Sequence, residues 1–128
     1  MRLNNKIALV TGAGSGFGRG IAARFAEEGA KLVVADINEE AAKIVAGEIG
    51  DSAIAVVADV SKNSDVEAMI QQTVTQWRRL DILVNNAGTT HRNKPMTEVT
   101  EEEFDRIFAV NVKSVFLTAR HGVPLMIE

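Results

Sequence analysis

The sequence predicts an α/β fold: a parallel, doubly wound sheet with helices on both faces. Short apolar runs alternate along the chain with amphipathic helical patterns, and only a few residues connect them. The run at 31–36 is too apolar to leave one face in water, which indicates a strand buried on both sides. Right-handed crossovers between such units then give a partial doubly wound sheet of about four strands and four helices within a single domain, 1–128.

Hydrophobic periodicity and turn residues set the expected elements. Gly29 ends the first helix, Asn38 caps the second, and capping boxes beginning at Ser64 and Thr100 open the third and fourth. The third helix places Trp77 against the sheet, and the fourth continues toward the end of the chain with an apolar stripe. The expected strands are 6–11, 31–36, 53–59 and 81–85, and the expected helices are 17–28, 39–48, 64–77 and 100 onward.

A glycine-rich stretch joins the first strand to the first helix. It holds Thr11, Gly12, Gly16 and Gly18 in the pattern T-G-x-x-x-G-x-G. Glycine permits positive φ and close approach to bare backbone, and a helix start offers unpaired N–H groups, so a phosphate or diphosphate fits there. The usual G-x-G-x-x-G fingerprint and the P-loop are both excluded by the spacing. A tight turn without a ligand is the alternative.

Asp36, at the end of the second strand, indicates which dinucleotide would bind. A carboxylate at this place can accept hydrogen bonds from both hydroxyls of an adenosine ribose. It would repel a 2′-phosphate, by roughly 4 kcal/mol for unit charges about 4 Å apart at an effective dielectric of 20. Ser15 and Ile37 are neutral, and Arg19 lies a turn into the helix. The residues therefore favour NAD over NADP, with a merely polar strand end as the alternative.

Two further polar residues have two readings each. Asp59, at the next strand end, can accept from an adenine amino group or can serve as a cap or turn acid. Asn111 falls on the apolar stripe of the last helix, where a buried amide without partners costs roughly 1–3 kcal/mol. We therefore expect its amide to be hydrogen-bonded, either as a satisfied core residue or in a functional role.

Together these motifs resemble the short-chain dehydrogenase/reductase family, whose members have a Rossmann-type fold. The resemblance rests on the glycine-rich stretch, Asp36, Asp59-Val60, Asn85-Asn86-Ala87-Gly88 and Asn111, in order over essentially the whole chain. The 3-oxoacyl-carrier-protein reductases and small sugar or polyol dehydrogenases are the members it resembles most. The resemblance implies hydride transfer between NAD(H) and a small carbonyl or alcohol substrate, in a homo-oligomer such as a dimer or tetramer.

The resemblance also implies roles for individual residues. Asn85 would help hold the central strand, and Asn111 would hold a water in the proton relay and so counts as a catalytic residue. Asp36 and Ile37 would meet the ribose, and Asp59 and Val60 would edge the adenine. The full set of implied cofactor-binding residues is Gly12, Ser15, Gly16, Phe17, Gly18, Asp36, Ile37, Asp59, Val60, Asn86, Ala87 and Gly88.

The family's chemistry also needs a serine and a Tyr-x-x-x-Lys segment that follow the helix containing Asn111. The 128 residues contain no tyrosine. We therefore expect them to be the amino-terminal half of a longer enzyme and to be inactive alone. The alternative is a non-catalytic dinucleotide-binding module or pseudo-enzyme. A methyltransferase that binds S-adenosylmethionine shares the glycine-rich turn, but the Thr11 pattern and the segment 85–88 argue against it.

Composition narrows the classes of partner. The net charge of −3 leaves no basic footprint, so no nucleic-acid partner is expected. Without cysteine and without a histidine cluster, no metal site is expected. The chain opens with no signal-peptide pattern and contains no apolar run of membrane length. These observations predict a cytoplasmic protein that has no membrane partner.

Overall fold

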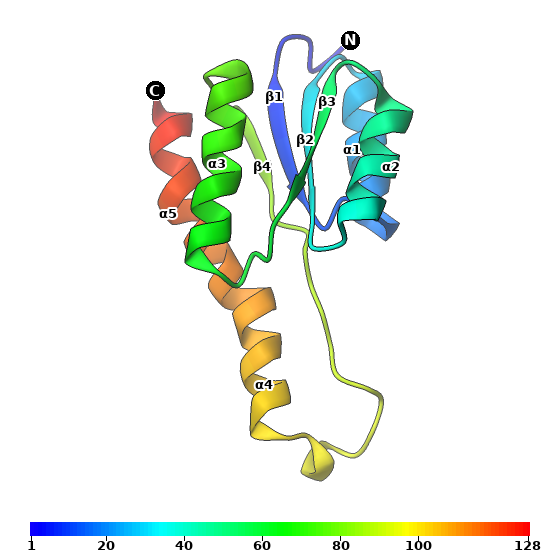
Figure 1. Cartoon of the computed structure of the whole chain (residues 1–128), viewed down its shortest axis with the longest axis vertical. Coiled ribbons are helices and arrows are strands. Elements are labelled where there is room, and N and C mark those ends of the chain that lie inside the picture. The colour runs from blue at the N-terminus through cyan, green and yellow to red at the C-terminus, as the bar shows by residue number, and fades with distance from the viewer.

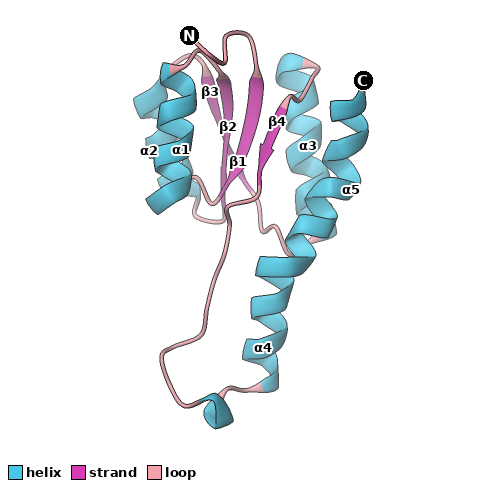
Figure 2. Ribbon diagram, turned by 180° about the vertical axis from the view of Figure 1, so that it is seen from behind, coloured by secondary structure: helices cyan, strands magenta, loops and turns pink.

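The computed structural model describes all residues from Met1 to Glu128 and places a parallel sheet between two layers of helices (Figure 1). Figure 2 shows α1 and α2 on one face of the sheet and α3 and α5 on the other. No helix combines the length and the apolar composition that a membrane span requires. The elements are β1 (Ile7–Thr11), α1 (Gly16–Glu27), β2 (Lys31–Asp36), α2 (Glu39–Ile49), β3 (Ala53–Val57), α3 (Asn63–Trp77), β4 (Ile82–Val84), the 3₁₀ turn η1 (Met96–Glu98), α4 (Glu101–Phe108), the π-helical turn η2 (Ala109–Lys113) and α5 (Ser114–Ile127).

The strand order is β3-β2-β1-β4, and every neighbouring pair is parallel. Ala8 of β1 pairs with Leu32 of β2 on one side and with Ile82 of β4 on the other. The order therefore reverses at β1, so β1 and β4 flank the switch point as the doubly wound prediction requires. The predicted fold class is confirmed.

Alternation along the strands divides the core into two layers, because successive side chains of a strand point to opposite faces. In β1 and β2, odd-numbered residues such as Leu9 and Val33 join the layer under α3 and α5, against which Trp77 also packs. Even-numbered residues of the same two strands, such as Val10 and Val34, join the layer under α1 and α2. The second layer is rich in alanine from both helices, so these helices lie close to the sheet. The helix residues that fill the two layers are Val66, Met69, Ile70 and Leu117 on one face, and Ala22, Ala42, Val45 and Ala46 on the other.

Three of the predicted helix ends are present. The side chain of Asn38 accepts from the backbone N–H of Ala41 at 3.0 Å, and that of Thr100 accepts from Glu103 at 3.1 Å. Gly29 follows α1 with φ of 93°, a conformation that glycine adopts without a Cβ penalty. Local sequence rules suffice here because each cap bonds only to its own helix.

The capping box predicted at Ser64 is wrong. Helix α3 begins one residue before Ser64, and its N-cap is Lys62, whose side chain makes no capping bond. The carboxylate of Asp65 in the first turn instead accepts the backbone N–H of Asp59 at 2.9 Å. This bond ties the start of α3 to the segment after β3, and it takes Asp59 out of the strand in which the sequence placed it. A tertiary partner has overridden the local signal.

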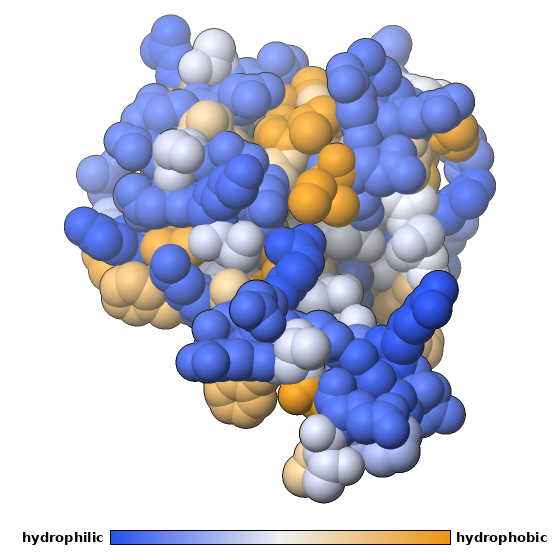
Figure 3. Space-filling view, turned by 60° about the horizontal axis from the view of Figure 1, so that its bottom comes forward, coloured by the Kyte–Doolittle hydropathy of each residue, from blue (hydrophilic) through white to orange (hydrophobic).

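The last helical segment is one continuous rod that changes character at η2. Its core-facing side is formed by Val110, Ser114, Leu117 and Thr118, which pack toward α3 and β4. The aromatic stripe of α4 lies outside this contact, and Phe104 and Phe108 stack on each other with ring centroids 4.6 Å apart. Figure 3 shows such apolar side chains as orange areas within a mainly hydrophilic surface. The residues of the predicted stripe that are exposed are Phe104, Phe108, Val115 and Phe116.

The expectation that Asn111 is buried is therefore wrong, because Asn111 lies in η2 with its side chain exposed. The helix buries the face that meets α3 and β4, and helical periodicity alone does not tell which of two partly apolar faces that is.

At the amino-terminal edge of the sheet, Asp81 connects the start of β1 to the segment that precedes β4. Its carboxylate accepts the backbone N–H of Ile7 at 2.8 Å and pairs with the guanidinium of Arg79. The hydrogen bonds from Arg79 lower the pKa of Asp81, partial burial opposes them, and the Ile7 bond adds to the lowering. Asp81 thereby fixes the start of β1 against the start of β4.

We predict that Asp81→Ala lowers the free energy of unfolding by about 1–3 kcal/mol near neutral pH, because the backbone N–H of Ile7 loses a charged acceptor. Since the folded pKa lies below its ordinary value of 3.8, this contribution is complete above that value and is lost as the pH falls through the folded pKa. Urea unfolding of wild type and variant near neutral pH and in acid measures both effects. Asp51→Ala, at an exposed turn aspartate, is the control. A difference between Asp81→Ala and wild type that grows in acid would contradict the assignment.

Candidate functional site

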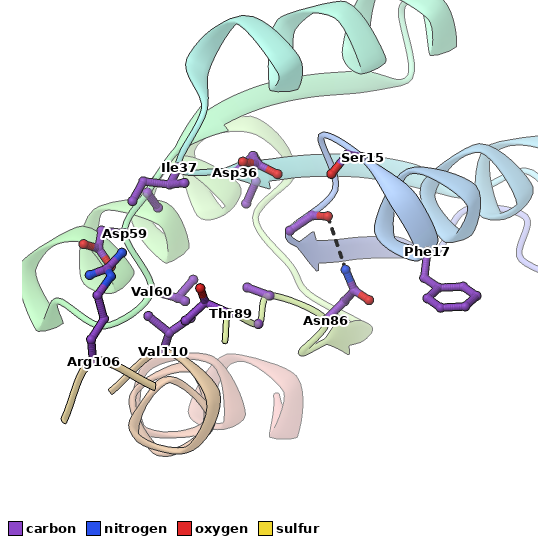
Figure 4. A pocket seen from close by; sticks show the side chains of 15 residues that line it. Ser15, Phe17, Asp36, Ile37, Asp59, Val60, Asn86, Thr89, Arg106 and Val110 are labelled. Carbon is purple, nitrogen blue, oxygen red and sulfur yellow. Dashed lines mark hydrogen bonds between the residues drawn. The ribbon is translucent and has the colours of Figure 1, made fainter. Parts of the chain in front are cut away.

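A cleft of about 430 Å³ opens at the carboxyl ends of the strands, where the switch point lies. Figure 4 shows its side chains coming from the glycine-rich turn, the ends of β2 and β3, the loop after β4, and the helical segment of α4 and η2 that carries Arg106 and Val110. Its lining residues are Gly12, Ser15, Phe17, Ala35, Asp36, Ile37, Ala58, Asp59, Val60, Asn86, Ala87, Gly88, Thr89, Arg106 and Val110.

The glycine-rich turn forms one wall, and its glycines have distinct reasons to be there. Gly12 and Gly16 have φ of 63° and 56°, which disfavour any residue with a Cβ. A Cβ on Gly18 would collide with the carbonyl oxygen of Gly12 and with the side chain of Asn86. Gly16, by contrast, has no neighbouring atom within 4 Å of that position, so its backbone faces open space. The turn thus leaves bare backbone accessible at the helix start.

The floor of the cleft is held by the buried hydroxyl of Thr11. It accepts the backbone N–H groups of Asn86 and Ala87, both at 3.0 Å, and lies 3.4 Å from the carbonyl oxygen of Val84. The side chain of Asn86 also donates to the carbonyl oxygen of Gly12 at 3.2 Å, the bond drawn in Figure 4. These bonds clamp the loop after β4 onto the glycine-rich turn.

Asp36 is placed by backbone donors at the mouth of the cleft. One carboxylate oxygen accepts the N–H of Gly14 at 2.8 Å, and the other accepts the N–H of Asn38 at 2.9 Å. A carboxylate has about four acceptor positions, so two remain for a ligand. The charge is therefore oriented before any ligand arrives, and Ile37 beside it is exposed.

Asp59 acts as a turn acid and also lines the cleft, while its contact with an adenine amino group stays a prediction. Its Oδ1 accepts both the backbone N–H and the hydroxyl of Ser61, at 3.0 and 2.6 Å, as a turn acid does. Oδ2 accepts nothing within the chain, and the residue also lines the cleft. Partial burial raises the pKa of Asp59, but the Ser61 bonds and the positive charges of Arg106 and Lys62 outweigh it, so the pKa is lowered.

Asn111 lies just beyond the lining residues and bonds to one of them. Its Oδ1 accepts the N–H of Thr89 and its Nδ2 donates to the carbonyl oxygen of the same residue, both at 2.8 Å. This two-bond pair joins the π-helical turn η2 to the loop after β4. In the same region Asn85 accepts the hydroxyl of Thr118 at 2.7 Å, so β4 is held to α5 as well.

The structure brings nearly all of the predicted cofactor-binding residues together, since only Gly16 and Gly18 do not line the cleft. Five further residues line the cleft without a sequence motif that indicates them: Ala35, Ala58, Thr89, Arg106 and Val110. Arg106 and Val110 are four residues apart on the helix that carries Asn111, so they share a face. That spacing was the one available signal, and it does not tell which face meets the cleft.

The cleft has the chemistry of a nucleotide site. Open backbone at a helix start suits a diphosphate, an oriented carboxylate at the neighbouring strand end suits ribose hydroxyls, and apolar walls suit a flat base. The crowding around Gly12 and Gly18 shows why these positions require glycine.

Comparisons with known proteins agree with this geometry. The family model for short chain dehydrogenase matches residues 6–128. The chain belongs to the short-chain dehydrogenase family. The resemblance that the sequence motifs indicated is thus confirmed, and with it an oxidoreductase family with a nucleotide-binding fold.

Individual relatives show how closely the chain follows the family. It is 54% identical over 127 residues to the 4-formylbenzenesulfonate dehydrogenase of Comamonas testosteroni, covering 97% of this chain and 50% of the relative. It is 43% identical over 127 residues to the sorbitol dehydrogenase of Cereibacter sphaeroides, covering 99% and 49%. A crystal structure of the 3-ketoacyl-(acyl-carrier-protein) reductase from Brucella melitensis complexed with NADH superposes with a TM-score of 0.94 at 51% identity, covering 96% and 51%. The chain spans about half the length of these relatives.

We predict that Gly18→Ala destabilises the fold by about 1–3 kcal/mol, because the added methyl group collides with backbone that cannot move without disturbing the turn. Gly20→Ala, on the same helix, meets no atom within 4 Å and should be neutral or stabilise by up to about 1 kcal/mol. Thermal unfolding of the two variants side by side measures the difference. Equal stability of both would show that the close approach at Gly18 has no consequence.

Proposed function

We propose that this chain forms the NAD(H)-binding part of an oxidoreductase that transfers hydride between nicotinamide and a carbonyl or alcohol substrate. The observation that carries the proposal is the Asp36 carboxylate, oriented by two backbone donors, beside the glycine-rich turn in one cleft. Membership of the short-chain dehydrogenase family and the NADH-bound structural relative support it.

The charges around the cleft favour NAD over NADP. Asp36 would face a 2′-phosphate with like charge at short range. Arg19, the basic residue nearest to the turn in sequence, donates from Nη2 to both carboxylate oxygens of Glu48, at 2.6 and 2.9 Å, and does not line the cleft. No cation is bonded to Asp36 that could balance the charge of a 2′-phosphate.

The residues of this chain divide the work of binding. The turn containing Gly12 and Gly16 offers N–H groups to the diphosphate, and Asp36 accepts the ribose hydroxyls. The free Oδ2 of Asp59 accepts a hydrogen bond from the amino group of adenine. When bound, the dinucleotide supplies or accepts the hydride. The serine, tyrosine and lysine of the family's reaction have no counterpart among residues 1–128, so catalysis by the whole protein requires residues beyond these.

We further propose that Asn111 positions the loop that lines the inner cleft, through its two bonds to Thr89, and serves the proton relay from there. For the whole protein we propose a small carbonyl or alcohol substrate, such as an oxoacyl thioester, an aldehyde or a polyol, in line with the relatives. The exposed aromatic stripe of α4 supports a homo-oligomer, a dimer or tetramer, as the assembled form.

One experiment tests the function itself. The protein from the complete coding sequence is incubated with NADH and panels of aldehydes, ketones and oxoacyl thioesters, and with NAD and polyols, while NADH absorbance is followed. Turnover with any of them supports the oxidoreductase. NADH binding without turnover, in a protein that lacks a serine and a Tyr-x-x-x-Lys segment after residue 128, would favour the non-catalytic module.

We predict that NADH binds at least about tenfold more tightly than NADPH, a difference of about 1.4 kcal/mol. Asp36→Asn should narrow the ratio to within about threefold, because it removes both the charged acceptor and the repulsion of a 2′-phosphate. Fluorescence titration with both cofactors measures this. Glu40→Gln, at a nearby exposed carboxylate, is the matched control and should leave the ratio unchanged. Tighter binding of NADPH by the wild type would refute the NAD assignment.

For Asn111→Leu we predict that kcat falls about tenfold or more, while the NADH dissociation constant changes by less than about threefold. The variant removes two hydrogen bonds from the loop and removes the amide that the proposed proton relay requires. Steady-state kinetics together with NADH titration separate the two effects. Asn93→Leu, in the exposed part of the same loop, is the control. An unchanged kcat would remove Asn111 from the relay.

A further inference from the structure

The outer end of the cleft carries a cation that no motif assigned. Arg106 of α4 is the only basic residue among those that line the cleft. Figure 4 shows its side chain extending from the helix toward Asp59, with Val60 and Val110 forming the wall beside it. A residue from the projecting helix therefore reaches the end of β3, which lies far from it in the sequence.

The guanidinium of Arg106 has no partner within the chain. Arg19 and Arg79 are both paired with carboxylates, whereas Arg106 makes neither an ion pair nor a side-chain hydrogen bond. It lies close enough for its charge to act on Asp59, whose Oδ2 is also free. A free donor group thus faces a free acceptor at the same opening.

Helix α4 itself is held loosely. None of its residues is buried, and it extends beyond the sheet in Figure 1. Apart from its continuation into η2, its polar connection is the ion pair between Lys94 and Glu103, which reaches the loop after β4 and not the sheet. A ligand touching Arg106 would connect this helix to the strand ends.

The chemistry at this opening suits an aminated aromatic base. A guanidinium is planar and weakly hydrated, and it stacks on aromatic faces, while a free carboxylate oxygen accepts from an amino group. Valine side chains beside them offer apolar contact. In the proposed cofactor, the adenine base has this combination of an aromatic face and an amino group.

Resting on the proposed function, we propose that Arg106 is a further cofactor-binding residue: its guanidinium covers the adenine base opposite Asp59 and links α4 to the bound dinucleotide. The role of Arg106 is one of binding and of ordering a helix. It is separate from the ribose contact of Asp36 and from the position of Asn111.

The first measurement is binding by the protein from the complete coding sequence. Arg106→Met should weaken NADH about three- to tenfold, the range expected for a cation over an aromatic ring. Arg106→Lys, which keeps the charge but loses the planar guanidinium, should bind NADH with an affinity between those of wild type and Arg106→Met. ADP-ribose, which has the adenine but no nicotinamide, should lose affinity for Arg106→Met by the same factor. Arg120→Met, at an exposed arginine of α5 outside the cleft, is the control and should match wild type.

The second measurement is hydrogen exchange in α4, which a change in affinity alone would not move. Saturating NADH should slow exchange of the amides of residues 101–108 in wild type and in Arg106→Lys. The same saturation should leave them unprotected in Arg106→Met, because the link between helix and base is gone.

The outcomes separate the two proposals. Failure of wild type to bind either NADH or ADP-ribose would overturn the proposed function. Normal wild-type binding with Arg106→Met no weaker than Arg120→Met would overturn the role of Arg106 alone. A loss seen with NADH but not with ADP-ribose would place Arg106 at the wrong end of the cofactor, and protection of α4 that persists in Arg106→Met would contradict the link to the helix.

Discussion

The hydroxyl of Thr11 is the interaction on which the site depends. It is 2% exposed and accepts two backbone N–H groups from the loop after β4, while Asn86 returns a bond to Gly12. Buried donors without partners would each cost about 1–3 kcal/mol, so the hydroxyl fixes the loop by satisfying them. The glycine-rich turn and the loop are thereby held together as wall and floor of the cleft.

The acids around this cleft are oriented by backbone before they meet anything else. Asp36 is held by two N–H groups, Asp59 by the Ser61 turn, and each keeps acceptor capacity toward the opening. Pre-orientation lowers the entropy lost when a ligand binds, because the side chains need not be ordered then. A single cation, Arg106, shares the cleft with these carboxylates. The proposed preference for sugar hydroxyls and an amino group over an additional phosphate rests on this balance of charge.

The helical rod formed by α4, η2 and α5 lies outside the sheet and contributes Arg106 and Val110 to the lining of the cleft. The π-helical turn sets Asn111 where its amide can pair with both backbone groups of Thr89. Such a turn interrupts the regular ladder of the helix and is frequently found at functional sites. Beyond it, α5 packs on α3 and β4, whereas the stacked Phe104 and Phe108 of α4 are exposed. An exposed aromatic face next to an ordered site is typical of a surface that meets another chain.

The sequence by itself determined the class of fold, the strand that starts the site, and most of the residues that line the cleft, but not Arg106 or Val110. These follow from local physics: apolar alternation selects strands, and T-G-x-x-x-G-x-G requires glycine where a Cβ would clash, as at Gly18. Parallel strands then bring their carboxyl ends to one edge of the sheet, so the sequence alone places Asp36 and Asp59 at the same cleft.

Only the tertiary structure decided matters in which distant segments compete for one group. The carboxylate of Asp65 accepts the N–H of Asp59, and α3 begins one residue before the cap predicted at Ser64. The last helical segment has two partly apolar faces, and the face that packs on α3 and β4 is the buried one. Asn111 is therefore exposed, and Arg106 lines the cleft. Periodicity reports that a face is apolar, but which neighbour covers it is a property of the packed chain.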